Sequence, residues 1–319
     1  MNQYRMRLFG CILVGMLASN VFGNDSATDR VQLTLRIGDR PFANYVYKDP
    51  QITRPYFCSV HSPSGIQVTR NHPVQPGDKD DHQTMHPGIW LSFGDLNGND
   101  YWRLKATTEH VRFVETLFSK SRDHQTFTVE NAYKTTNGNS TVCSEICRYD
   151  LHSLKAGTLL IATSDFTGEK EFYFGDQEEM GLGVRLATPI SVDRKQGGRI
   201  LDSERRLNGD GVWGKQAAWC DYSGSVSGKG VGITLLPSPR NFRASWWHAR
   251  DYGFVAANPF GKAAFEKGEK SKTVVKPGTT FRVQFGIFIH DELPLGKIDR
   301  SAALLQQVYE EFKKKTGQR

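Results

Sequence analysis

Residues 281–289 read FRVQFGIFI, and an apolar side chain stands at every second position of this stretch. Successive side chains of a strand point to opposite faces of a sheet. Phe281, Val283, Phe285, Ile287 and Ile289 would therefore cover one face, and the alternation predicts a strand with that face in a core.

The same period of two recurs along the chain. Val31–Ile37 alternates before Gly38-Asp39, and Thr158–Phe166 is a fuller apolar run that Gly168 ends. Ser227–Gly230 between two valines predicts a hairpin, and 31 Gly with 13 Pro favour tight turns. The pattern predicts an all-β fold, an antiparallel β-sandwich or supersandwich. With no linker and no internal repeat, residues 24–319 are expected to form a single domain.

Only the C-terminal segment has a clear helical period. Asp299 is placed to cap this helix. Its apolar stripe is predicted at Ala303, Leu304, Val308, Tyr309 and Phe312. We expect a single C-terminal α-helix that packs on a sheet.

The N-terminus has the features of a secretory signal peptide. Arg5 and Arg7 precede an apolar run from Leu8 to Ala18, and Val21-Phe22-Gly23 fits a cleavage site. Residues 1–23 are therefore predicted to be removed, and the protein to be exported to the periplasm or the extracellular space. No later stretch has the length of a membrane helix, so no integral membrane association is expected.

The net charge and the cysteines indicate which functional classes are excluded and which disulfides are possible. The formal net charge is +7, and loss of Arg5 and Arg7 would lower it to about +5, without a basic stripe of the kind that nucleic-acid binding needs. Cys143 and Cys147 would lie ~13 Å apart on a strand, too far to bridge each other. Each is free to pair with Cys58 or Cys220, and buried free thiols are the equal alternative.

Polar and aromatic residues are concentrated between Asp80 and Arg103. His82 and His86 are four apart, behind Asp80 and Asp81. On a helical turn the two histidines share a face, as metal ligands often do, whereas on a strand they lie ~13 Å apart and cannot bind one ion. The segment is therefore compatible with three interpretations: a divalent metal site, a metal-free polar site, or a structural loop.

The stretch Gly175–Arg185 is the second candidate. In an extended strand Glu179 and Arg185 point to the same side, with Gly181 and Gly183 between them. The two glycines predict an open floor where a ligand reaches the backbone, and the carboxylate is a candidate general base or acid. A salt-bridged strand face is the structural alternative.

Two tryptophan-rich stretches complete the pattern. They are Trp213–Asp221 and Ser245–Gly253, and in the second His248, Arg250 and Asp251 alternate with aromatic rings. Aromatic faces accept the apolar faces of sugars, while charged groups bind the hydroxyls. His61 precedes a Ser-Pro-Ser-Gly turn at a strand end, and Ser64 lacks the setting of a serine hydrolase nucleophile.

These residues together resemble a known family, the PmoA-like family of exported proteins typical of planctomycetes. The motifs that carry the resemblance span nearly all of residues 24–319: Arg54-Pro55-Tyr56-Phe57, His61–Gly65, Thr69-Arg70, Asp81-His82, His86–Trp90, Phe93-Gly94-Asp95, Asp100–Arg103, Glu179–Arg185, Trp219–Tyr222, Arg250–Gly253 and Asn258–Gly261.

The resemblance implies a β-supersandwich similar to the galactose mutarotase-like fold, which usually handles carbohydrate. Epimerases with that fold use a histidine acid and a glutamate base. The family's name points to a methane oxygenase subunit, but such a subunit is a bundle of membrane helices, which this sequence does not encode.

Three hypotheses follow. The first is a carbohydrate-processing enzyme with Glu179 as general base and His82, His86 or His248 as acid, acting on a small-molecule or oligosaccharide ligand. Its predicted substrate-binding residues are His61, Arg70, Asp81, Trp90, Trp102, Arg103, Arg185, Trp219, Trp247, Arg250, Asp251 and Asn258. The second is a carbohydrate-binding protein without chemistry. The third is a metalloprotein with His61, His82, His86 or His248 as ligands; no other cofactor is predicted.

Overall fold

The computed structural model describes residues 29–121, 123–291 and 293–317. The predicted signal peptide, residues 1–23, lies outside them, so export stays a prediction. Among the described residues, no helix combines the length and the apolar character needed to cross a membrane.

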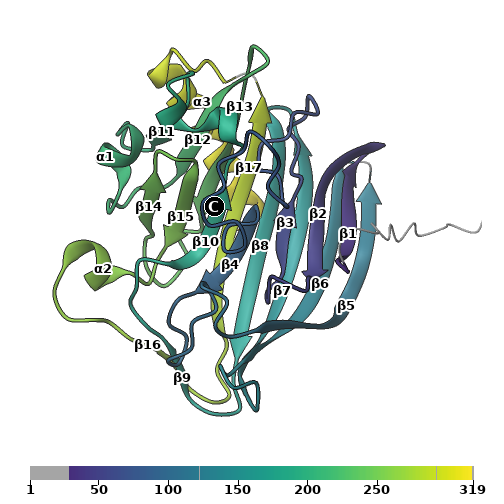
Figure 1. Cartoon of the computed structure of the whole chain (residues 1–319), viewed down its shortest axis with the longest axis vertical. Helices are drawn as coiled ribbons and strands as arrows, with labels where there is room; N and C mark the ends of the chain where they lie inside the picture. Colours follow the sequence, from purple (N-terminus) through teal and green to yellow (C-terminus); the bar gives the residue numbers. More distant parts are fainter. Residues whose placement is uncertain (1–28, 122, 292, 318–319) are drawn as a thin grey trace, which may run out of the picture.

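Two large sheets form a sandwich, and the strand pairs of the described residues are antiparallel (Figure 1). The predicted fold class is confirmed. The seven-stranded sheet runs in the order β1 (Val31–Ile37), β2 (Arg40–Lys48), β3 (Tyr56–Cys58), β4 (Ile89–Phe93), β10 (Met180–Arg185), β15 (Phe254–Asn258) and β14 (Trp246–Arg250).

The second sheet has eight strands. Its order is β11 (Arg199–Asp202), β12 (Cys220–Val226), β13 (Lys229–Pro237), β17 (Phe281–Asp291), β8 (Gly157–Thr167), β7 (Thr141–Leu154), β6 (His124–Lys134) and β5 (Thr108–Ser121). A two-stranded sheet pairs β16 (Thr273–Val275) with β9 (Phe172–Phe174). The short helical segments are η1 (Thr188–Ile190), η2 (Val192–Arg194), α1 (Asn208–Val212) and α2 (Lys262–Glu266).

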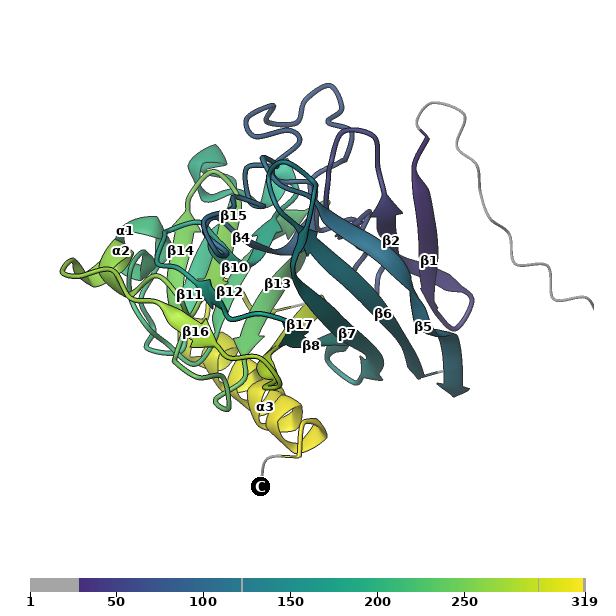
Figure 2. The same cartoon turned by 90° about the horizontal axis from the view of Figure 1, so that it is seen from below.

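Strand β17 behaves as its alternation predicts. Val283, Phe285, Ile287 and Ile289 are buried in the main core between the sheets. The intervening Phe288 is also buried, on the opposite face, because helix α3 (Ile298–Lys315) covers that side. Gly286 leaves room for the helix, since a Cβ there would lie 2.9 Å from the ring of Phe312. Figure 2 shows α3 against the eight-stranded sheet, with β4, β10, β14 and β15 beyond it.

The buried apolar stripe of α3 differs from the predicted one at Ala303 and Leu304. Leu305, Val308, Tyr309 and Phe312 are buried, but Ala303 is exposed and Leu304 is 38% exposed. Asp299 does not cap the helix: the N-cap is Lys297, and Asp299 pairs with the exposed Arg205. The predicted β12–β13 hairpin is confirmed, with Ser227 and Gly228 as a two-residue turn of positive φ.

The cysteines of the described chain are buried free thiols, at Cys58, Cys143, Cys147 and Cys220. They belong to different apolar clusters: Cys143, Cys147 and Cys220 lie in the main core, and Cys58 on the outer face of the seven-stranded sheet. The buried-thiol alternative therefore describes this structure, and no disulfide links these cysteines.

Candidate functional site

A cleft of about 210 Å³ opens on the outer face of the seven-stranded sheet. Segments far apart in the sequence meet there because β4, β10, β15 and β14 are neighbours in the sheet. The lining residues are His82, Met85, His86, Trp102, Arg103, Glu178, Glu179, His248, Arg250, Tyr252 and Phe254.

Strand alternation sorts the tryptophan-rich segment between cleft and core. In β14, His248 points to the cleft, whereas Trp247 is fully buried in the main core. The sugar-stacking role predicted for Trp247 is therefore wrong, because its ring has no face open to a ligand. Trp219 is likewise 1% exposed; it packs under α3, where its indole N–H donates to Gln306 Oε1 at 3.0 Å.

The predicted open floor over β10 is closed by two indole rings. A Cβ on Gly183 would lie 2.7 Å from Trp90 and 2.9 Å from Trp102. The two rings pack edge to face with centroids 5.3 Å apart, and each is almost completely buried. Gly183 thus makes room for the indoles instead of a ligand. Trp102 lines the cleft together with Tyr252 and Phe254, and Trp90 supports it from below.

The loop that carries the two histidines does form a helical turn. The His86 N–H donates to the carbonyl of His82 at 2.9 Å. The rings stack, with centroids 4.7 Å apart and planes 16° from parallel, and His86 also stacks on Phe254. Ring nitrogens accept in the ring plane, so two stacked rings do not converge on one ion. The described residues hold no group of three or more His, Cys, Asp or Glu side chains placed for a metal.

Three buried arginines build the cleft, where sequence reasoning placed two of them as ligand contacts. Arg70 is 1% exposed and donates to four carbonyls of the loop, those of Lys79, Asp81, His82 and His86. Arg54 donates to the carbonyls of Tyr101, Trp102 and Met85. Arg185 is also 1% exposed and binds Asp81. The predicted hydroxyl-orienting role is therefore wrong for Arg70 and Arg185.

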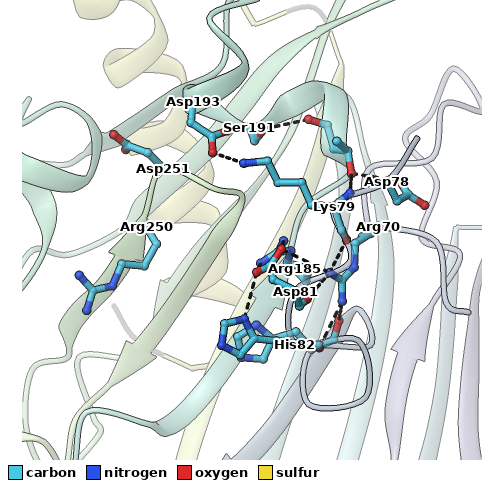
Figure 3. Close-up of polar contacts among 12 residues, drawn as sticks. Arg70, Asp78, Lys79, Asp81, His82, Arg185, Ser191, Asp193, Arg250 and Asp251 are labelled. Carbon is cyan, nitrogen blue, oxygen red and sulfur yellow. Dashed lines mark hydrogen bonds and ion pairs between the residues drawn. The ribbon is translucent and has the colours of Figure 1, made fainter. Parts of the chain in front are cut away.

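Asp81 connects Arg185 to His82. Its carboxylate accepts from both Arg185 Nη atoms and lies 3.0 Å from His82 Nδ1 (Figure 3). These contacts outweigh partial burial and lower the pKa of Asp81 to about 2. Arg185 also lies over the Tyr252 ring, 4.6 Å from its centroid. The ring of His82 thus contacts a carboxylate that is itself ion-paired with Arg185.

Glu179 and Arg103 form one wall of the cleft. Arg103 Nη2 lies 2.5 Å from Glu179 Oε2, and Arg103 Nη1 lies 3.1 Å from Asp100 Oδ2. The Glu179 side chain is 31% exposed, so it is accessible to a ligand. The ion pair with Arg103 fixes the position of this carboxylate at the edge of the cleft.

The opposite wall contains Glu178, which sequence reasoning missed. Its Oε1 accepts from Arg250 Nη2 at 2.7 Å and from the Trp213 indole N–H at 3.0 Å. His248 Nε2 is 3.1 Å from the same oxygen and accepts from Arg250 Nε at 3.2 Å. Burial, reinforced by the charge of Arg250, lowers the pKa of His248 to about 4, so this ring is neutral near pH 7. Burial also lowers the pKa of His86 well below its usual value.

The remaining predicted site residues lie elsewhere. His61 borders a different cavity. Asp251 accepts from the backbone N–H of Gly209 at α1, apart from the Arg70–Asp81–Arg185 group (Figure 3). Asn258 is fully buried and donates to the carbonyls of Gln177 and Glu178, which holds the backbone that carries Glu178 in place. Its role is structural support of the wall.

Sequence reasoning missed Glu178, Met85 and Phe254 as lining residues, whereas it placed Tyr252 among the aromatic residues of a groove. Phe254 carried a signal, because it is two positions after Tyr252 and alternate residues of an extended segment share one side. Glu178 did not, because the irregular backbone before β10 lets both Glu178 and Glu179 face the cleft, and period two does not apply there.

The fold and this cleft define an all-β sandwich protein with acid–base groups collected on one sheet face. The chain belongs to a family of unknown function, DUF6807, whose model matches residues 32–304. The PmoA-like name is not supported by this match. No curated protein matches the chain.

Several solved structures are similar in fold. A galactose mutarotase-like protein from Lactobacillus casei is 11% identical, with a TM-score of 0.42 over 81% of this chain and 100% of that chain. A putative aldose 1-epimerase from Escherichia coli K12 is 11% identical, with a TM-score of 0.38 over 82% and 99%. The α-galactosidase from Lactobacillus brevis is 9% identical, with a TM-score of 0.40; this chain spans 40% of its length. At these identities the likeness concerns the fold alone.

Proposed function

We propose that the cleft binds one sugar unit and transfers a proton on it by acid–base catalysis. The observation that carries this proposal is the convergence of Glu178, Glu179, His82 and His248 above an aromatic floor. Ligand pockets for drug-sized molecules usually measure about 300–1,000 Å³. A cleft of about 210 Å³ is smaller and suits a single ring.

In this proposal, we assign a role to each group from its contacts and its exposure. Glu179 is an accessible carboxylate and serves as general base. His82 is assigned the role of general acid, because its ring lines the cleft and its Nδ1 is oriented by the Asp81 carboxylate at 3.0 Å. His86 and His248 have lowered pKa values and remain neutral, so they are poor proton donors near pH 7. They bind hydroxyl groups in this proposal.

Sugar binding without chemistry is the second candidate. It is favoured by the ion pairs of both carboxylates, Glu178 with Arg250 and Glu179 with Arg103. Carboxylates held by a guanidinium accept hydrogen bonds from hydroxyl groups, and the oxygen that the guanidinium occupies is less available to take a proton from the sugar. Proton transfer at the bound sugar distinguishes the two candidates.

The test begins with a ligand-observed NMR screen of neutral and acidic monosaccharides. Hits are then followed for anomer exchange and for deuterium uptake from D₂O. Glu179→Gln should retain binding and lose turnover by about 10²–10⁴-fold, the usual contribution of a general base. The matched control is Glu169→Gln, because Glu169 is exposed and does not line the cleft.

Each outcome has one meaning. Binding without exchange in the wild-type protein establishes the second candidate. Exchange that Glu179→Gln leaves unchanged removes Glu179 from the base role. A screen in which no sugar binds rejects both candidates.

A further inference from the structure

A second and larger cavity lies at one end of the sandwich. Its volume is about 420 Å³, twice that of the cleft, and the two share no lining residue. Its walls come from the Ile37–Phe42 hairpin, the turn around His61–Gly65, the β7–β8 connection, the end of β17 and one side of α3. Neither the fold nor the proposed function explains this cavity.

One wall of the cavity is aliphatic. Leu304, Leu305 and Val308 of α3 line it, together with Leu154 and Ala156 of the β7–β8 connection. Leu304 is 38% exposed, whereas its neighbours Leu305 and Val308 are buried against the sheet. An exposed leucine that faces a cavity is covered from water when an apolar ligand occupies that cavity.

The cavity wall also contains a buried histidine of β17. His290 is 1% exposed, and its Nε2 lies 2.8 Å from Asp221 Oδ1. Its Nδ1 is buried and has no partner among the described residues. Because Nδ1 is buried and Nε2 contacts Asp221, His290 forms part of the cavity wall and offers no open polar atom to a ligand.

The cavity is also cationic at its rim. Arg40 and Lys155 are exposed lining residues, and neither is ion-paired within the described part of the chain. The carboxylate of the one acidic lining residue, Asp291, already accepts from the backbone N–H and the hydroxyl of Ser64. Arg40 Nη1 donates to the carbonyl of Pro63 at 2.6 Å, which leaves its positive charge uncompensated. Two cations and one carboxylate give the rim a net positive charge, which favours an anionic group.

We propose that this cavity binds an amphiphile with an aliphatic chain and a terminal carboxylate, such as a medium-chain fatty acid. The chain lies along Leu304 and Val308, and the carboxylate lies between Arg40 and Lys155. The site is independent of the sugar cleft and of its chemistry.

Calorimetric titration with octanoate, nonanoate and decanoate, below their micelle concentrations, tests the proposal. Burial of one methylene contributes about 0.8 kcal/mol, so Kd should fall about fourfold for each added CH₂. Decyltrimethylammonium, with the opposite charge, should bind at least tenfold more weakly than decanoate. No binding at any chain length, or equal binding of both charges, overturns the proposal.

Matched variants locate the site. Leu304→Asn should weaken decanoate binding about tenfold or more, while Leu207→Asn should not, although both leucines are 38% exposed. The double substitution of Arg40 and Lys155 by Gln should abolish the preference for the anion. Leu304, Arg40 and Lys155 are all exposed, so we expect these variants to fold. If decanoate binding is unchanged in Leu304→Asn and in the double variant, the amphiphile binds elsewhere and the proposal is wrong.

Discussion

Arg185 on β10 and Asp81 on the histidine loop form a two-pronged ion pair although they are 104 residues apart in the sequence. The contacts measure 2.9 Å from Nη1 to Oδ2 and 2.6 Å from Nη2 to Oδ1. The guanidinium is buried and lies on Tyr252, so it depends on Asp81 for charge compensation. This pair positions His82 over the cleft.

Replacement of Asp81 by Asn should destabilise the protein because it leaves the Arg185 charge buried without a carboxylate. Loss of one partner of a fully buried pair costs about 3–5 kcal/mol; here we expect about 2 kcal/mol, because the Asp81 side chain is 36% exposed. Urea unfolding measures the change. Asp80→Asn, at the exposed neighbouring carboxylate, is the control and should shift stability by less than about 0.5 kcal/mol.

Replacement of Gly183 by Ala should disrupt the floor of the cleft. The added methyl group would lie within 2.9 Å of both indoles, and overpacking of this kind costs about 1–3 kcal/mol. Gly211→Ala is the matched control, because a Cβ there has 3.6 Å to its nearest neighbour, Arg206. Equal unfolding midpoints for the two variants would show that Trp90 and Trp102 move aside freely.

Stability should depend on pH through His248. The folded protein keeps this ring neutral down to about pH 4, whereas an unfolded histidine takes up a proton near pH 6.5. The unfolded state therefore binds more protons between these values, and the free energy of unfolding falls as pH drops through this window. Between pH 8 and pH 4, the decrease in the free energy of unfolding should be smaller in His248→Gln than in the wild-type protein by on the order of 3 kcal/mol, because each pKa unit corresponds to about 1.4 kcal/mol. The same slope in both proteins would contradict the lowered pKa.

The cysteines should be unreactive in the folded protein. Burial raises the pKa of the Cys58 thiol to about 11, and the pKa of Cys143, Cys147 and Cys220 is raised for the same cause. A thiol reagent added to residues 24–319 without reductant should modify none of the four at pH 8 and all four in denaturant. Fewer than four in denaturant would indicate a disulfide in solution.

Much of the sandwich was predictable from local pattern. The alternation in β17 identified its core face, and the Ser227-Gly228 turn identified a hairpin. The histidine segment contributes both His82 and His86 to the lining of the cleft, and their functional role stays a prediction. Helix α3 was expected, but its stripe was predicted with Leu304 buried, because period alone does not say where the sheet beneath a helix ends.

The roles of charged and aromatic residues were less predictable. Arg70, Arg185 and Asn258 looked like ligand contacts but are buried and hold backbone carbonyls or Asp81. Trp219 and Trp247 looked like sugar platforms but are core residues. Residue type alone does not distinguish a buried arginine bound to carbonyls from one open to a ligand, since the difference depends on segments distant in sequence.

By itself the sequence determined the β-sandwich and the core face of β17, and it indicated segments that carry acid–base groups, because these follow from side-chain periodicity and chemistry over a few neighbouring residues. Only the tertiary structure decided that β4, β10, β15 and β14 lie side by side, that Glu178 joins Glu179 in one cleft, and that Trp90 and Trp102 fill the space over Gly183. Burial, charge compensation and pKa depend on contacts between distant segments, and those exist only once the sheets have formed.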